Sequence, residues 1–179
     1  MGGHRWRDRR RAGARHHDLP HGGLTISDDR AIERLADEVR RRAQREGVTV
    51  AVAESLTGGA LSAALAKAGD AGAWFAGGVV AYRNATKYRV FEVPEGPVVT
   101  ADAARAMALG VLDLTGADLA VAVTGVGGPG PEEGRPSGTV FFCAVSASEV
   151  RESAQAFDGD PEDVVAQTIT HALSMLVAL

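Results

Sequence analysis

Hydrophobic residues recur at two different spacings along the chain, and the alternation between them predicts helices and strands in turn. Apolar residues three and four apart follow Ser27, which can cap a first helical turn, and Gly47 ends this pattern. Residues 48–53 form a short β-branched run that predicts a strand. A turn at 57–59 and an alanine-rich stretch at 60–68 follow, so we expect a strand, a tight turn and a helix in succession.

The same two spacings continue to the end of the sequence. Residues 125–138 hold too much glycine and proline for a regular element, so they predict a long loop. The remaining elements that we expect are strands at 78–82, 118–124, 139–145 and 149–157, the last two paired as a hairpin, a helix at 101–114 capped by Thr100, and a final helix capped by Asp160 and opened by Pro161.

Strands that alternate with helices predict an α/β fold. We expect a single three-layer domain at residues 24–179, with a sheet flanked by helices that is mixed because of the late hairpin. In such sheets, ligands collect beyond the carboxyl ends of strands, where loops and helix N-termini present backbone N–H groups. The unusual loops at 55–59 and 125–138 both follow strands, so we expect them to form the functional site.

Charge is distributed unevenly along the chain. Residues 1–23 hold six arginines, two aspartates and almost no apolar residue, which predicts a disordered basic extension. Without this segment, the 19 basic and 23 acidic residues fall to 13 and 21, a net charge near −8 that argues against binding to a nucleic-acid backbone. A basic tail that contacts nucleic acid or a membrane surface is the alternative.

The apolar runs are short. None approaches the roughly 18 residues that a membrane span requires, and the basic extension lacks the apolar segment of a secretory signal. We therefore expect a cytoplasmic protein with no membrane partner. Cys143 is the only cysteine, and its apolar neighbours favour a buried strand position over a reactive thiol.

Ser55 is the candidate nucleophile, because it lies on the turn between the first strand and its helix. The nearby Gly58 and Gly59 allow close backbone approach and could supply N–H donors to an oxyanion or a phosphate. The alternative is that Ser55, or Thr57, only caps the helix.

A serine hydroxyl needs a base to remove its proton, and histidine is a poor candidate in this chain. Four of the five histidines lie in the basic extension, and His171 falls in the final helix, where a structural role is the simpler interpretation. A desolvated lysine is the other known solution. Of the two lysines, Lys67 is expected on a solvated helix face, whereas Lys87 follows a polar cluster just past a strand end.

The glycine-rich loop at 125–138 matches no common phosphate-binding motif. It has neither the Gly-Lys-Ser/Thr ending of a Walker loop nor a Gly-x-Gly-x-x-Gly pattern that opens a helix. By itself it could be a plain surface connection. No metal-ligand spacing occurs in the sequence, so we expect no metal.

Four segments taken together resemble one known family. They are 52–59 (VAESLTGG), 74–87 (WFAGGVVAYRNATK), 122–129 (AVTGVGGP) and 136–140 (PSGTV). In this order and spacing they are similar to the C-terminal domain family of the competence-damage-inducible protein CinA, whose enzymes are nicotinamide-nucleotide amidases. The similarity spans about residues 28–179.

This resemblance implies hydrolysis of nicotinamide mononucleotide to nicotinate mononucleotide and ammonia, in pyridine nucleotide salvage and without a cofactor. It implies that Ser55 is the nucleophile, Lys87 the general base, and Tyr82 a residue that positions or activates this pair. We also expect a homo-oligomer, since small domains of this family commonly associate. The residues that we assign to the nucleotide substrate are Thr57, Gly58, Gly59, Asn84, Thr124, Gly125, Gly127, Gly128 and Arg135.

The chain departs from the family at two positions where an arginine is common. Pro161 and Val165 occupy these positions, and either change could remove a cation that pairs with the substrate phosphate. Arg135 stands where a lysine is usual and could compensate. Two further hypotheses therefore stay open: an amidase for a different amide, and a module that binds nucleotides without turning them over.

Overall fold

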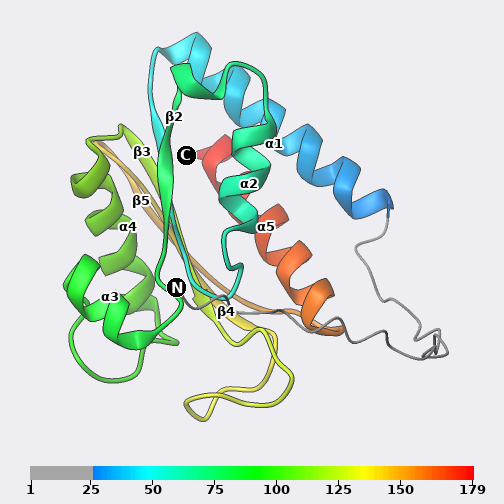
Figure 1. The fold of residues 1–179 in the computed structure, drawn as a ribbon, viewed down its shortest axis with the longest axis vertical. Helices are drawn as coiled ribbons and strands as arrows, with labels where there is room; N and C mark the ends of the chain where they lie inside the picture. Colours follow the sequence, from blue (N-terminus) through cyan, green and yellow to red (C-terminus); the bar gives the residue numbers. More distant parts are fainter. Residues whose placement is uncertain (1–25) are drawn as a thin grey trace, which may run out of the picture.

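The computed structural model describes residues 26–179, and the expectation of a disordered extension at 1–23 lies outside them. The elements run in the order α1 (Ile26–Glu46), β1 (Val50–Glu54), α2 (Ala60–Lys67), a 3₁₀ turn η1 (Ala71–Ala73), β2 (Phe75–Val80), α3 (Asn84–Phe91), α4 (Ala101–Thr115), β3 (Leu119–Gly125), β4 (Thr139–Ser146), β5 (Val150–Ala156) and α5 (Pro161–Ala178) (Figure 1).

The five strands form one mixed sheet in the order β2-β1-β3-β4-β5. β1 pairs in parallel with both β2 and β3, whereas β3, β4 and β5 pair antiparallel. The predicted α/β class, the mixed sheet and the late hairpin are therefore confirmed. Among the described residues, no helix is long and apolar enough to cross a membrane.

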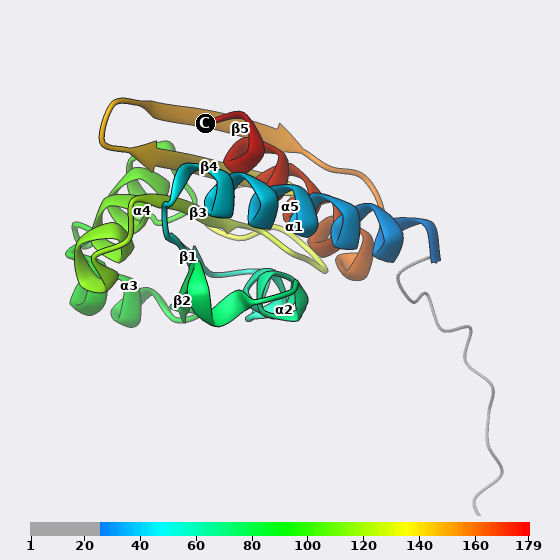
Figure 2. The same ribbon diagram turned by 90° about the horizontal axis from the view of Figure 1, so that it is seen from above.

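Helices cover both faces of this sheet, as Figure 2 shows from above. Helices α1, α2 and α5 pack on one face and α4 on the other, with α3 beside it. In β1, the valines Val50 and Val52 face the three-helix layer, and the alanines Ala51 and Ala53 face α4. β3 alternates in the same way, so alanines give α4 a shallow face on which to pack closely.

The connections on either side of β1 diverge. The chain leaves β1 through α2 to reach β2, and then passes through α3 and α4 to reach β3 on the other side of β1. This divergence is a topological switch point, where the loops beyond the strands separate and leave a crevice. The crevice lies at the carboxyl ends of β1, β2 and β3.

Three local expectations were wrong. Helix α3 was not predicted, because we interpreted its residues only as a polar cluster after a strand. Strand β2 begins at Phe75, three residues before the expected start, since Gly77 and Gly78 hide its apolar pattern. Helix α1 begins at Ile26, so Ser27 lies within the helix instead of before it.

Other expectations are confirmed. Cys143 is fully buried in β4, and burial raises the pKa of its thiol to about 11. Lys67 is exposed at the end of α2. His171 packs in α5 against Phe142 and hydrogen-bonds the Ser153 hydroxyl at 3.0 Å, a structural role.

Candidate active site

A cavity of about 350 Å³ opens at the switch point. Segments that follow all three parallel strands line it, together with α3 and the chain that leads into α4. Its lining includes Ser55, Leu56, Tyr82, Asn84, Lys87, Val98, Val99, Thr124 and residues 125–132. The structure therefore brings together most of the residues that the sequence singled out.

Ser55 lies directly after β1 and is only 6% exposed. Its hydroxyl has no hydrogen-bond partner among the described residues, yet it is not sealed from the cavity. Ser55 does not cap α2, because the N-cap residue is Gly59. The structural alternative for this side chain is thus removed, and its hydroxyl is available to a ligand.

Glu54, which we did not single out from the sequence, builds the turn that carries Ser55. Its side chain is fully buried, and its carboxylate accepts hydrogen bonds from the N–H groups of Gly59, Leu61 and Ser62 at 2.8–3.1 Å. The hydroxyls of Thr57 and Ser62 also donate to it. A buried carboxylate thus satisfies the N–H groups at the start of α2, which a capping side chain would otherwise bind.

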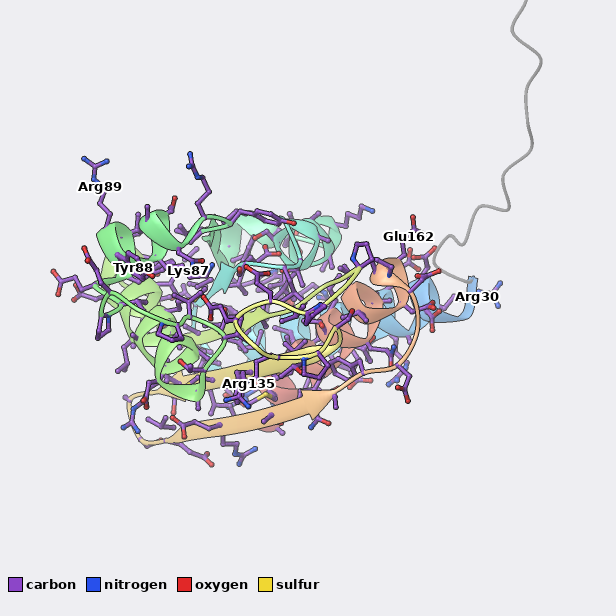
Figure 3. All side chains as sticks on the ribbon, turned by 90° about the horizontal axis from the view of Figure 1, so that it is seen from below. Arg30, Lys87, Tyr88, Arg89, Arg135 and Glu162 are labelled. Carbon is purple, nitrogen blue, oxygen red and sulfur yellow. The ribbon has the colours of Figure 1, made fainter. Side chains whose placement is uncertain are left out.

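Lys87 extends from α3 toward the cavity and is only 2% exposed. Figure 3 shows it pointing inward, whereas Arg89 on the same helix points away from the molecule. Burial lowers the pKa of the amine, and the negative charges of Glu132 and Glu133 partly oppose this effect. A lysine with a lowered pKa has a larger neutral fraction near neutral pH and can accept a proton.

The Lys87 amine donates one long hydrogen bond, of 3.4 Å, to the backbone carbonyl of Tyr82. The Tyr82 side chain itself lines the cavity but is 68% exposed. In this structure Tyr82 therefore contacts the lysine through its backbone and not through its phenol. No direct hydrogen bond joins Ser55 to Lys87, although both line the same cavity.

The glycine-rich loop closes one side of the cavity. Thr124 lines the cavity, but its hydroxyl donates to the carbonyl of Val98 at 2.9 Å, so it fixes the wall. Gly125, Gly127 and Gly128 also line it, as predicted.

The remaining predicted residues lie elsewhere. Thr57, Gly58 and Gly59 do not line the cavity, and the N–H groups of the two glycines already bond the Ser55 carbonyl and Glu54. They are therefore poorly placed as oxyanion donors, which corrects our expectation.

Arg135 also lies outside the cavity lining, and its guanidinium is 5.6 Å from the centre of the Phe141 ring.

The N–H group of Leu56, by contrast, has no protein acceptor among the described residues. It comes directly after Ser55, and Leu56 lines the cavity. An unbonded N–H group directly after a nucleophile is a position typical of an oxyanion donor.

A second hollow, of about 310 Å³, adjoins the first and shares four of its lining residues, Leu56, Tyr82, Gly127 and Gly128. The start of α5 supplies its other wall through Pro161, Glu162 and Val165.

No lysine or arginine lines this second hollow in the described chain. The Asp160 carboxylate accepts hydrogen bonds from the N–H groups of Glu162 and Asp163, so these groups are not available to a ligand. This hollow is apolar and acidic, so it is unsuited to an anion.

Within residues 26–179, no three potential metal ligands lie close enough together to hold an ion. The chemistry that the described cavity offers is therefore that of a buried serine beside a buried, desolvated lysine. That pair suits acyl transfer.

A family model described as the CinA C-terminal domain matches residues 32–179. Nicotinamide-nucleotide amidohydrolase PncC of Pseudomonas putida is 39% identical over 154 residues, which cover 83% of this chain and 96% of that protein. A CinA-like protein of Citrifermentans bemidjiense is 36% identical over 157 residues. The match spans 84% of this chain but only 37% of that longer relative.

Solved structures show the same fold. A CinA superfamily protein from Escherichia coli matches with a TM-score of 0.80 at 32% identity, covering 87% of this chain and 94% of that one. Another, from Klebsiella pneumoniae, matches with a TM-score of 0.79 at 35% identity, covering 82% and 96%.

Proposed function

This chain belongs to the CinA C-terminal domain family, and on that premise we propose that it is an amidase that hydrolyses the carboxamide of nicotinamide mononucleotide. The products are nicotinate mononucleotide and ammonia. A relative that is named a nicotinamide-nucleotide amidohydrolase and aligns over almost its whole length supports the reaction class. We propose that the protein acts in the cytoplasm on this small-molecule substrate.

The observation that carries the proposal is the shared cavity of Ser55 and Lys87. The serine hydroxyl is unpartnered and faces the cavity, and burial lowers the pKa of the lysine. An unpaired nucleophile and a desolvated amine on one ligand-sized cavity are the two groups that a serine-lysine hydrolase requires.

The reaction begins with proton transfer. Neutral Lys87 accepts the hydroxyl proton of Ser55 while the serine oxygen attacks the carboxamide carbon. The carbonyl oxygen becomes an oxyanion, and the Leu56 N–H group stabilises it, an interaction worth about 3 kcal/mol of barrier. The transfer requires the Ser55 hydroxyl and the Lys87 amine to come within hydrogen-bond distance when substrate is bound.

Collapse of the tetrahedral intermediate then breaks the C–N bond. Lys87, now charged, returns its proton to the departing nitrogen, which leaves as ammonia. The acyl group stays on Ser55 as an ester. Water, deprotonated by the same amine, attacks this ester and releases the nicotinate product, which restores Ser55 and Lys87.

Ammonia release from nicotinamide mononucleotide by the full chain tests this function. We expect release by the parent, loss of about 10³-fold or more in Ser55→Ala, and unchanged release in Ser148→Ala, which removes an exposed serine of the β4–β5 turn. Binding of the nucleotide without ammonia release would instead support a non-catalytic module. Release that persists in Ser55→Ala would refute the serine mechanism.

The second hollow favours one variant of this function, an amidase for a substrate without a phosphate. Glu162 is the charged residue among those that line this hollow, and the adjoining cavity is lined by Glu132 as well as by Lys87. A phosphate there would meet negative charge. Comparison of kcat/KM for nicotinamide riboside and its mononucleotide decides between the two: preference for the riboside supports this variant, and preference for the mononucleotide contradicts it.

A further inference from the structure

Glu133 stands out among the loop residues because its backbone is strained. Its φ is +50° and that of Gly134 is +75°, so both central residues of the turn are left-handed. Glu132 and Arg135 close this turn with two backbone hydrogen bonds, of 3.0 and 2.8 Å. A left-handed backbone is unfavourable for a residue other than glycine, so we expect contacts of the Glu133 side chain to offset the strain.

These contacts join three separate segments around the cavity. The Glu133 carboxylate accepts hydrogen bonds from the N–H groups of Val98 and Val99, at 2.7 and 2.8 Å, and from the Asn84 side-chain amide at 3.1 Å. Val98 and Val99 line the same cavity as the loop. Asn84 is the first residue of α3, the helix that carries Lys87.

On the basis of the proposed function, we propose that Glu133 is a positioning residue: its carboxylate fastens the glycine-rich loop to α3 and to residues 98–99, and so fixes the wall of the cavity around Lys87 and Ser55. The backbone hydrogen bonds of Val126 and Gly138 tie the loop at its base, whereas the bonds of Glu133 join its far part to the rest of the molecule. Thr124, the residue before the loop, donates a hydrogen bond to the Val98 carbonyl and so ties β3 to the same segment.

A positioning role predicts a distinctive pattern of variants. Glu133→Ala removes every acceptor, and we expect kcat/KM for ammonia release to fall about tenfold or more, because charge-assisted bonds are lost and substrate groups are misplaced. Glu133→Gln retains one acceptor oxygen, so we expect it to recover part of this loss. Glu95→Gln, which removes the same charge from an exposed residue near Val98, is the matched control and should behave like the parent.

A second readout does not require catalysis. Backbone hydrogen exchange at Val98, Val99 and residues 125–138 should become faster in Glu133→Ala and remain at the parent rate in Glu95→Gln. Unchanged exchange together with unchanged kcat/KM would overturn the proposal. If the parent protein releases no ammonia but exchange is still faster in Glu133→Ala, the result would support Glu133 as the fastening residue and count only against the amidase function.

Discussion

The two lysines of the chain illustrate how environment decides the role of a residue. Lys67 is exposed at the end of α2 and Lys87 is buried on α3, although both amines have the same intrinsic chemistry. Lys87 has only one long hydrogen bond to offset the loss of its hydration. Its burial therefore costs stability, and we interpret this cost as the source of its reactivity.

We predict that Lys87→Met abolishes ammonia release and does not destabilise the fold. Methionine has a similar length and no desolvation cost, so the free energy of unfolding at pH 7 should rise by about 1 kcal/mol. Because the buried amine has a lowered pKa, this gain should shrink as pH rises and vanish above the ordinary lysine value of 10.5, where the unfolded chain also carries a neutral amine. Lys67→Met should change neither property.

The pH profile of ammonia release should report the protonation state of Lys87. Activity requires neutral Lys87, so kcat should rise with pH to a plateau, with a midpoint below 10.5. Glu132→Gln removes a negative charge that favours the charged amine, and we expect the midpoint to move to lower pH. A midpoint that stays in place or moves upward would show that Lys87 is not the titrating base.

The sequence predicted some site residues and missed others for identifiable reasons. Ser55 and the glycines after β3 follow strand ends, a pattern visible in the sequence. Glu54 is the last residue of a buried strand, so its capping of α2 depends on a turn geometry that no linear spacing reveals. Arg135 was placed near the substrate by its position in the loop, but the turn at Glu133 directs it toward Phe141.

At the scale of elements, α2 and α5 start in different ways. Asp160 caps α5, as its sequence predicted, and the structure adds an exposed capping box with Asp163. Helix α2 instead relies on the buried Glu54. The two helix starts differ in stability because buried N–H groups that lose their acceptor cannot form a hydrogen bond to water instead.

We therefore predict unequal costs for the two helix starts. Glu54→Ala should reduce the free energy of unfolding by about 3–5 kcal/mol, because three N–H groups and two hydroxyls lose a buried acceptor. Asp160→Ala should cost only about 1 kcal/mol. Urea denaturation of both variants measures the difference, and equal costs would contradict the role assigned to Glu54.

Most elements could be predicted because their apolar spacing is regular, and their observed ends lie within a few residues of the expected ones. Helix α3 could not be predicted in this way, because it has only eight residues and its N-cap Arg83 makes no side-chain capping bond. Two of its residues, Thr86 and Val90, are also weak helix formers. It is held by packing of Phe91 against α4, where Gly110 leaves room for the ring. Such support is tertiary and does not show in a local pattern.

At the scale of the molecule, β2 is an open edge of the sheet and carries no charged residue. Val80 and Tyr82, at its carboxyl end, are 43% and 68% exposed. An uncharged edge strand favours association with another chain, so we predict a homo-oligomer through this edge. Val80→Lys should lower the mass measured by light scattering, whereas Val150→Lys, on the opposite edge strand, should not; a monomeric parent would contradict this prediction.

The proposed reaction passes through a covalent intermediate at Ser55. Rapid-quench mass spectrometry tests for this intermediate. The protein is mixed with nicotinamide mononucleotide and quenched with acid within milliseconds, and its peptides are then mapped. We predict an acyl adduct on the peptide that contains Ser55, which forms with a burst of ammonia and is absent from Lys87→Met. Steady ammonia release with no adduct at any time, or an adduct on another residue, would contradict a mechanism with Ser55 as the nucleophile.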